Sequence, residues 1–312
     1  MIKALVVGYG SIGSRHAKVL RELGCDVTVV SERVVDFPQT SSSLAEAFSR
    51  SFFDYVVIAN RTGDHYRTVC ELIRHNYEGV VLIEKPIFEK TYELPKHNFK
   101  HCYVAYNLRF HPLMQKLKAA IETEKVISVQ VYVGQYLPNW RPESDYRVSY
   151  SASKSKGGGV LRDLSHELDY LLWLFGDWNN VVAIGGKYSQ LDIESEDVFA
   201  ILAETKRCPI INIQMNYLDR NSKREIIVNT EKHSIKLDFV KGSFELDGDR
   251  VEISVERDFT YGTQHKAVLS GETGSLCTLE QGYKVMRFLE SIEKSAMLKR
   301  WISNEKDLYD LC

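Results

Sequence analysis

The chain has 312 residues, 44% hydrophobic and 26% charged, which is enough for about two globular domains with cores of their own. Its 40 Lys and Arg residues against 42 Asp and Glu residues give a formal net charge of −2, without a concentrated basic stripe. This balance argues against nucleic acid or an anionic membrane as the main partner. No apolar run approaches the length that spans a bilayer, and the first ten residues lead into a strand and a glycine turn rather than a secretory signal.

Six cysteines are scattered along the chain. None forms a CxxC pair, and no Cys/His spacing is typical of a metal site, so we expect no bound metal. Scattered thiols of this kind are typical of reduced cysteines in the cytoplasm, which is the location that we expect.

The first third of the sequence has the pattern of a nucleotide-binding half. An apolar run, IKALVV, is suited to a buried parallel strand, and GYGSIG follows it at once. Gly8, Gly10 and Gly13 have G-x-G-x-x-G spacing, and a helix is predicted to follow. In this context Gly8 permits a tight turn, Gly10 lets a pyrophosphate approach the backbone, and Gly13 allows the helix to pack closely on the strand.

The expected dinucleotide is NAD. A second strand is predicted over residues 26–30, and Glu32 lies just past it, at the distance beyond the glycines that this fingerprint shows. An acid at this position accepts hydrogen bonds from the adenosine ribose, which favours NAD. Ser31 and Arg33 flank it and are groups that accommodate a 2′-phosphate, so NADP stays open.

The alternation of strand and helix continues beyond this point. Strands are predicted over residues 52–60, 79–86 and 102–112, with a helix over 64–75. Such alternation predicts a doubly wound parallel sheet, in which ligands gather at the carboxyl ends of the strands. The expected cofactor contacts, at the helix start and at these strand ends, are Ser11, Ile12, Glu32, Arg33, Asn60, Thr62, His65, Glu84, Lys85 and Asn107.

Lys85 stands at the carboxyl end of a predicted strand, between Glu84 and Pro86. A lysine beside a nicotinamide has the chemistry to move a proton or to bind a substrate oxygen. A surface salt bridge with Glu84 explains the same residue equally well from the local sequence.

The pattern changes after about residue 112. A helix and an alternating strand come first, followed by a loop over 150–159 that is rich in Ser, Lys and Gly. Several more alternating runs predict an antiparallel sheet with turns such as DGDR, and an amphipathic helix is predicted near the end. We therefore divide the chain into a Rossmann domain, residues 1–114, and an α/β domain with a large, open, mainly antiparallel sheet, residues 115–312.

A further helix is predicted within GGGVLRDLSHELDYLLWLFG, residues 157–176. Its apolar residues fall on one arc at 3.6 residues per turn. The other arc carries Asp163, His166, Glu167 and Tyr170. Such an arc is usually a solvated face. Two features favour a functional site instead. Nearby acids favour the charged form of His166, and the three glycines let the backbone approach a bound group closely at the start of the helix.

Four motifs carry a family resemblance, namely GYGSIG, IEKP at 83–86, YNLRFHP, and GGGVLRDLSHELD further on. Together they resemble the glucose–fructose oxidoreductase, inositol dehydrogenase and MocA (Gfo/Idh/MocA) family over essentially the whole chain. The resemblance implies a Rossmann domain, then an α/β domain whose open sheet mediates homo-oligomers. It also implies NAD(P)-linked oxidation or reduction of a sugar or polyol, with the catalytic roles carried over to Lys85, Asp163 and His166.

One departure concerns the acid and the histidine, which many family members space four residues apart. Here Asp163 and His166 are three apart. Alignment on His166 puts Arg162 in the place of the acid, and alignment on Asp163 puts Glu167 in the place of the histidine. Both spacings keep two side chains on one helical face, so we retain Asp163 and His166.

The leading hypothesis is hydride transfer between a nicotinamide and a hydroxyl or carbonyl of a sugar or sugar nucleotide. His166 exchanges the proton of the substrate oxygen, Lys85 stabilises the alkoxide, and Asp163 orients the imidazole or a substrate hydroxyl. This requires Lys85 and His166 to meet at the nicotinamide. The helix variant also resembles family members associated with bacterial surface-glycan biosynthesis. Weaker substrate contacts are expected from Arg109, Tyr150 and Tyr170.

Two alternatives stay open. The first is a polyol or inositol dehydrogenase of catabolism. The second is a non-catalytic NAD(P)-sensing regulator on the same fold, against which the presence of both Lys85 and His166 argues. In the 141–154 region, Arg141, Arg147 and Lys154 have the charge to meet a carboxylate or diphosphate, although a solvated loop explains them as well.

Overall fold

The computed structural model describes residues 1–304, which divide into two compact units. The first unit comprises residues 1–110 and 256–286, and the second comprises 111–255 and the described residues from 287 on. The sequence predicts residues 256–286 in the second domain, and here the structure differs. The helix and the short strand of this segment pack within the first unit. The local sequence pattern cannot predict that the chain returns to an earlier domain.

The first unit is built on a seven-stranded sheet in the order β15-β6-β5-β4-β1-β2-β3. Strands β1 to β6 are all parallel, and β15 joins the β6 edge antiparallel. The order 3-2-1-4-5-6 is that of a Rossmann fold, as predicted. The strands are β1 (Lys3–Val7), β2 (Asp26–Val30), β3 (Thr40–Ser41), β4 (Tyr55–Ile58), β5 (Val80–Ile83), β6 (His101–Val104) and β15 (Cys277–Thr278).

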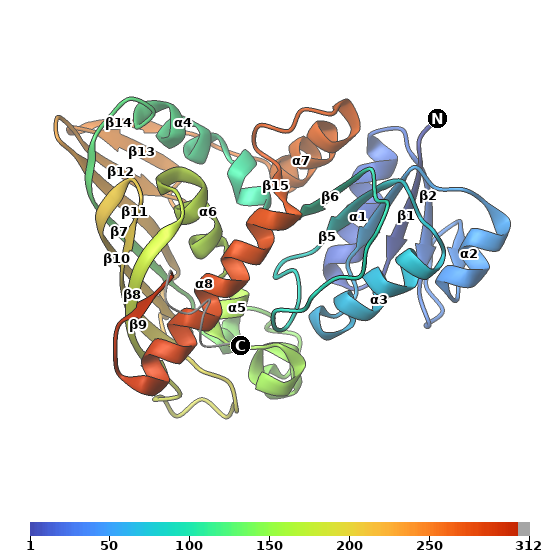
Figure 1. The fold of residues 1–312 in the computed structure, drawn as a ribbon, viewed down its shortest axis with the longest axis horizontal. Helices are drawn as coiled ribbons and strands as arrows, with labels where there is room; N and C mark the ends of the chain where they lie inside the picture. Colours follow the sequence, from blue (N-terminus) through green and yellow to red (C-terminus); the bar gives the residue numbers. More distant parts are fainter. Residues whose placement is uncertain (305–312) are drawn as a thin grey trace. The chain divides into compact units, whose positions relative to one another are not determined.

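Helices α1 (Ser11–Glu22), α2 (Leu44–Arg50) and α3 (Thr62–Arg74) alternate with these strands (Figure 1). Helix α1 buries Ala17 and Leu20 at helical spacing, which places an apolar side against the sheet. Helix α7 (Phe259–Ser270) comes from the returning segment and contacts α1.

The YNLRFHP segment is not a strand to its end. Strand β6 stops at Val104, the chain turns through a short 3₁₀ helix, η1 (Asn107–Phe110), and α4 (Pro112–Ala120) begins at Pro112. Proline suits the first position of a helix because no N–H is needed there. His111 caps this helix, its Nδ1 accepting the Leu113 N–H at 3.2 Å. The predicted strand over 102–112 is therefore wrong beyond Val104.

The second unit is built on a nine-stranded sheet in the order β14-β13-β12-β11-β7-β10-β9-β8-β16. Neighbouring strands are antiparallel except for β7 and β10, which confirms the predicted mainly antiparallel sheet. The strands are β7 (Val126–Gly134), β8 (Trp178–Gly186), β9 (Val198–Thr205), β10 (Cys208–Asn216), β11 (Lys223–Thr230), β12 (Ser234–Asp238), β13 (Ser243–Leu246), β14 (Asp249–Glu252) and β16 (Ile302–Ser303).

One face of this sheet is covered by helices, among them α4 and α6 (His166–Phe175) (Figure 1). Helix α8 (Leu279–Leu298) starts in the first unit, and its later part packs on β8 through stacked Trp178 and Phe288. The alternation along the strands leaves the opposite face open, with outward side chains such as Leu202 and Ile210 exposed.

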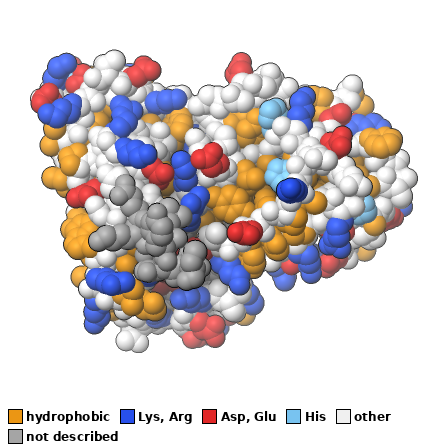
Figure 2. Space-filling model, in the orientation of Figure 1, with side chains coloured by type: hydrophobic (Ala, Val, Ile, Leu, Met, Phe, Trp, Pro, Cys, Tyr) orange, Lys and Arg blue, Asp and Glu red, His pale blue; other side chains and the backbone are white. Residues whose placement is uncertain are grey.

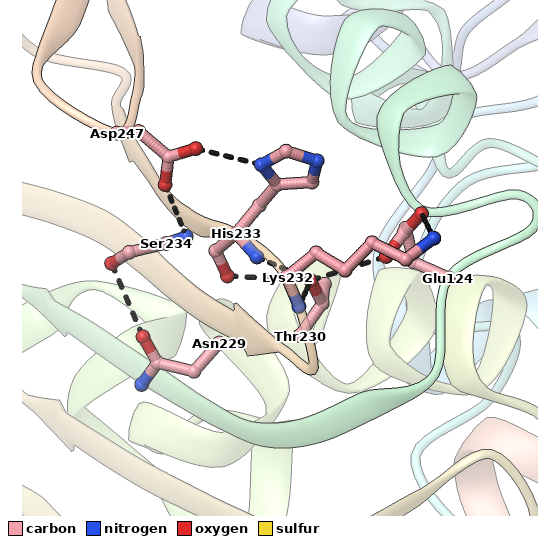
Figure 3. Close-up of polar contacts among 7 residues, drawn as sticks. All are labelled: Glu124, Asn229, Thr230, Lys232, His233, Ser234 and Asp247. Atoms are coloured by element: carbon pink, nitrogen blue, oxygen red, sulfur yellow. Dashed lines mark hydrogen bonds and ion pairs between the residues drawn. The ribbon is translucent and has the colours of Figure 1, made fainter.

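The hairpin that joins β11 to β12 is fixed by polar contacts (Figure 3). Thr230 Oγ1 accepts the N–H of His233 at 2.9 Å, and the His233 ring lies 2.6 Å from the Asp247 carboxylate. Asp247 begins the predicted DGDR turn and, like Gly248, has a positive φ. These contacts hold the register in which β11 pairs with β12.

Charged side chains of both signs are interspersed over the face of the molecule shown in Figure 2. Within residues 1–304, no helix is both long enough and apolar enough to cross a membrane.

Candidate functional site

The glycine turn after β1 has the shape that a dinucleotide requires. Gly8 has φ +97°, and a Cβ there would lie 2.7 Å from the Ala59 carbonyl oxygen. A Cβ on Gly13 would lie 2.0 Å from the Gly8 oxygen, so α1 crosses β1 at a distance that only glycine allows. Gly10 differs, because a Cβ there would have no atom within 4 Å. The close-packed glycines therefore hold a turn whose middle glycine opens onto free space.

Helix α1 begins at Ser11, and its N-cap residue, Gly10, has no side chain to cap it. Its first N–H groups and its dipole are therefore available to an anion. Ser11 is exposed and Ile12 is half-buried beside it. These features fit the pyrophosphate of a dinucleotide at the place that the spacing predicts.

The next predicted cofactor contacts follow β2 and β4. Glu32 and Arg33 are both exposed just past the end of β2. Past β4, Asn60 donates from Nδ2 to Thr68 at 2.8 Å, whereas its buried Oδ1 has no hydrogen-bond partner among residues 1–304. A buried oxygen of this kind is normally satisfied by a ligand or water. Thr62 is half-buried at the start of α3.

His65 has a structural task in the same region. It is 1% exposed, and its Nδ1 lies 3.0 Å from the carbonyl oxygen of Ile87 while its Nε2 lies 3.3 Å from that of Asn60. Burial lowers the pKa of His65 below its ordinary value, although these carbonyls act in the opposite direction. The ring therefore ties α3 to the segment that follows Lys85.

Lys85 is half-buried directly after β5, and Glu84 beside it is 8% exposed. The local sequence allows a surface salt bridge between the two residues, but Glu84 is buried. Its carboxylate lies 2.8 Å from His16 Nε2 and accepts the backbone N–H of Lys85 at 3.0 Å. Burial is the largest influence on the pKa of Glu84 and raises it, but His16 and Lys85 together hold it below its ordinary value.

Asn107 and Arg109 lie in η1 and are both buried. Asn107 donates to Thr260 of α7 at 2.9 Å, and Arg109 donates to Gln281 at 2.8 Å. Arg109 is 1% exposed, so these contacts favour a structural role for it.

In the second unit, the predicted helix over residues 160–175 is interrupted. Helix α5 (Val160–Asp163) ends at Asp163, and α6 begins at His166. Around Leu164 the hydrogen bonds tighten to i→i−3, from the N–H of Ser165 to Arg162 and from the N–H of Glu167 to Leu164. Asp163 and His166 therefore lie on two helices, and the argument from one continuous helical face is wrong.

The residues at the two alternative positions of the family pattern, Arg162 and Glu167, both form ion pairs. Arg162 forms a paired ion bridge with Glu293, at 2.6 and 3.2 Å, and Glu167 forms another with Arg224, at 2.6 and 3.0 Å. Both alternative residues are thus committed to buried ion pairs. Their commitment supports Asp163 and His166 as the functional pair.

Asp163 is 7% exposed and accepts the Tyr217 hydroxyl at 2.5 Å. The Asp163 charge raises the pKa of Tyr150 well above its ordinary value, with burial adding to the effect. Burial first and the same carboxylate second raise the pKa of Tyr217. Two phenols that stay protonated therefore lie beside one carboxylate.

The polar arc of this segment is not a solvated face. Glu167 and Tyr170 are at most 1% exposed, whereas His166 is partly exposed. Burial, with help from Glu167, raises the pKa of Tyr170 well above its ordinary value. Its hydroxyl has no hydrogen-bond partner within the described chain, which leaves it able to meet a ligand.

Several residues of these networks escape a reading of the sequence. His16 sits on the apolar side of α1, and an imidazole at such a position is a detectable signal. Tyr217 and His265 carry none, because their partners are far away in the chain. Glu196 is equally silent in sequence, yet burial raises its pKa to about 7. Among residues 1–304, no three His, Cys, Asp or Glu side chains are placed to hold a metal ion.

A Rossmann unit with an open glycine turn, followed along the chain by a unit with a large mixed sheet, is typical of a class of dinucleotide-binding proteins. Comparison with known families agrees. A family model described as the GFO/IDH/MocA C-terminal domain matches residues 114–236, and one described as putative NAD(P)-binding matches residues 1–81. A search of curated proteins finds no match to the chain.

Solved structures share the fold over nearly the whole chain. Levoglucosan dehydrogenase in complex with NADH has a TM-score of 0.83 at 15% identity, over 97% of this chain and 98% of that one. The WlbA dehydrogenase from Bordetella pertussis, in complex with NADH and UDP-GlcNAcA, has a TM-score of 0.77 at 20% identity, over 97% and 98%. GenD2 from gentamicin A biosynthesis, in complex with NAD, has 0.76 at 21%, over 97% and 96%.

The chain therefore matches the C-terminal domain of the Gfo/Idh/MocA family over residues 114–236 and a putative NAD(P)-binding domain over residues 1–81. These matches confirm the family resemblance and the predicted NAD(P)-type dinucleotide-binding domain, and the solved structures confirm the fold class.

Proposed function

We propose that the protein transfers hydride between NAD and a hydroxyl or carbonyl of a sugar or sugar nucleotide. The observation that carries this proposal is the glycine turn, where Gly8 and Gly13 leave no room for a side chain while Gly10 opens onto free space. The uncapped start of α1 and the orphaned Asn60 oxygen fit the same ligand. When bound, the nicotinamide supplies or accepts the hydride.

The protein's own residues handle the proton and the charge. His166 takes the proton of the substrate hydroxyl during oxidation and returns it during reduction, a task for which its partial exposure suits it. Lys85 places its ammonium against the developing alkoxide. Asp163, fixed by Tyr217, orients a substrate hydroxyl or the imidazole. Positions for these roles come from the family motifs, and the buried contacts of Glu84 beside Lys85 and of Asp163 support them.

A substrate with a negative group suits the second unit. Arg141 is exposed and its charge acts on the Tyr150 hydroxyl. It therefore lies near Tyr150, one of the two phenols beside Asp163. Lys154 is exposed as well, whereas Arg147 is paired with Asp145 at 2.8 Å. The exposed cations Arg141 and Lys154 support a carboxylated or nucleotide-linked sugar, and with it a role in surface-glycan biosynthesis. The WlbA neighbour, which was crystallised with UDP-GlcNAcA, supports the same choice.

The test is a turnover screen with NAD and NADP, and with their reduced forms, against levoglucosan, UDP-GlcNAcA, inositol and a set of keto sugars. We expect NAD-linked turnover with a sugar or sugar nucleotide, and faster turnover with a negatively charged one. Arg141→Gln is expected to raise KM for that substrate without changing KM for a neutral sugar. Tight NADH binding with no turnover across the panel would support the regulator instead.

We also propose that the open face of the nine-stranded sheet pairs with a second copy of the chain. Ile184, Leu202 and Ile210, on neighbouring strands β8, β9 and β10, are 73%, 47% and 56% exposed there. Exposed apolar side chains grouped on one face mark an interface. Sedimentation equilibrium is expected to show an oligomer that Leu202→Glu dissociates, and a monomeric wild type would refute this.

A further inference from the structure

A chain of four buried side chains crosses the first unit and ends at Glu84. Glu84 Oε1 lies 2.8 Å from His16 Nε2, and His16 Nδ1 lies 2.8 Å from His265 Nε2. His265 Nδ1 then lies 3.0 Å from the Tyr55 hydroxyl. The exposed fractions are 8% for Glu84, 1% for Tyr55, and 0% for each imidazole. So many polar groups are buried only where they satisfy one another.

The four residues come from four elements of the unit. His16 lies in α1, the helix that begins at the glycine turn, and Tyr55 lies in β4. His265 lies in α7, which belongs to the segment that returns from late in the chain. Glu84 follows β5 and connects directly to Lys85. The chain of contacts therefore ties the helix at the cofactor turn to the residue before the predicted catalytic lysine.

The number of donors and acceptors in this chain fixes the direction of the hydrogen bond between His16 and Glu84, whether His16 is neutral or charged. Burial, with His16 next, lowers the pKa of His265 well below its ordinary value, and burial raises that of Tyr55 well above its own. His265 is then neutral, Tyr55 is a phenol, and Glu84 is a carboxylate that only accepts. If His16 is neutral, protons point from Tyr55 through His265 and His16 to Glu84. If His16 is charged, it donates both to Glu84 and to His265.

In either arrangement the proton on His16 Nε2 is donated to Glu84. The second carboxylate oxygen is left to accept the backbone N–H of Lys85 at 3.0 Å. Tyr261 packs edge-on against the His16 ring, with centroids 5.3 Å apart, so the imidazole has little freedom to turn away. Glu84 also acts electrostatically on His65 and Tyr261, the other titratable groups that face it.

We propose that His16 and His265 are positioning residues for Lys85. They hold and orient the Glu84 carboxylate, and Glu84 in turn fixes the backbone at Lys85 and places a negative charge beside it. This inference rests on the proposed function of Lys85 in hydride transfer. It adds that a helix far along the chain, α7, completes the environment of the lysine.

Burial and His16 act on the pKa of Glu84 in opposite directions, so removal of the His16 imidazole leaves the effect of burial in place. Without His16, burial favours the protonated form of Glu84, and the negative charge that Glu84 places beside Lys85 is reduced. The free amine of Lys85 then becomes more abundant at mildly alkaline pH. This change is measurable without any substrate, because only the free amine reacts with trinitrobenzenesulfonate.

The test compares His16→Leu, His16→Gln, His265→Leu and Glu84→Gln with Tyr55→Phe. Tyr55→Phe serves as the matched control, since it removes only the hydroxyl at the far end. For each variant, mass spectrometry measures the rate of Lys85 labelling, and kinetics with the best substrate of the turnover screen measure kcat and KM. NADH binding and thermal unfolding show which variants are folded.

We expect His16→Leu, His265→Leu and Glu84→Gln to raise the Lys85 labelling rate by about threefold or more, and kcat to fall about tenfold with KM nearly unchanged. His16→Gln keeps a donor for Glu84, so its Lys85 labelling rate and its kcat are expected to stay close to those of the wild type. Tyr55→Phe is expected to change both quantities little. Folded variants with wild-type labelling and kcat would overturn the proposal. If labelling shifts while no sugar is turned over, the positioning role stands and the proposed function fails.

Discussion

Glu196 gives the sharpest stability prediction of the second unit. It is 8% exposed, and its Oε1 has no hydrogen-bond partner among the described residues. Burial raises its pKa from 4.5 to about 7, with the charge of Glu293 adding to the rise, while Arg162 and Lys154 oppose it. At about 1.4 kcal/mol for each pH unit, this rise corresponds to about 3 kcal/mol of unfolding free energy.

The sign follows from proton binding. Because the folded chain binds the Glu196 proton more tightly than the unfolded chain does, this contribution is fully present below about pH 4.5 and is lost as the pH rises to about 7. In Glu196→Gln the side chain cannot ionise. The variant is therefore expected to gain about 3 kcal/mol relative to wild type between these two pH values.

Urea unfolding of both proteins at a series of pH values, followed by hydrogen exchange of second-unit amides, measures this difference. Glu194→Gln is the matched control, because Glu194 lies two residues earlier and is exposed. It should follow the wild-type profile. Parallel profiles for wild type and Glu196→Gln would refute the reasoning.

Two further substitutions test the two units separately. Gly13→Ala puts a Cβ 2.0 Å from the Gly8 carbonyl oxygen, a backbone atom that cannot move aside. The variant is expected to be destabilised and to lose NADH binding, as measured by fluorescence titration. In Gly10→Ala the new Cβ meets no atom within 4 Å, so this variant should fold with near-normal stability. Tyr217→Phe removes the donor to the buried Asp163 carboxylate and is expected to lower the free energy of unfolding by about 2 kcal/mol, with unchanged unfolding counting against this role.

Local sequence patterns predict the parts of the fold that local physics determines. Strand β2 matches the predicted residues 26–30, since an apolar run beside a glycine turn has few other solutions. The return of α7 and β15 to the first unit could not be predicted, because β15 pairs with β6, more than half the chain away. In α7 the buried side includes Gln264 and His265, so no apolar stripe marks the helix.

The candidate site divides in the same way. Lys85, Asp163 and His166 could be proposed from the sequence because their motifs are short and contiguous. The burial of Glu167 could not, because it depends on Arg224, which arrives from β11. An isolated helix with several acids predicts a solvated face, and only tertiary ion pairs and hydrogen bonds reverse that expectation. The break at Leu164 likewise leaves no glycine or proline signal in the sequence.

A double-mutant cycle on Lys85 and His166 tests the central assignment most directly. With the best substrate of the turnover screen, Lys85→Ala and His166→Ala are each expected to lower kcat by about 10²- to 10⁴-fold while NADH still binds. Residues that act on one reacting oxygen lose their effects together, so the double variant should be close to the worse single variant. Near-wild-type kcat in either single variant, or losses that multiply in the double variant, would contradict the account.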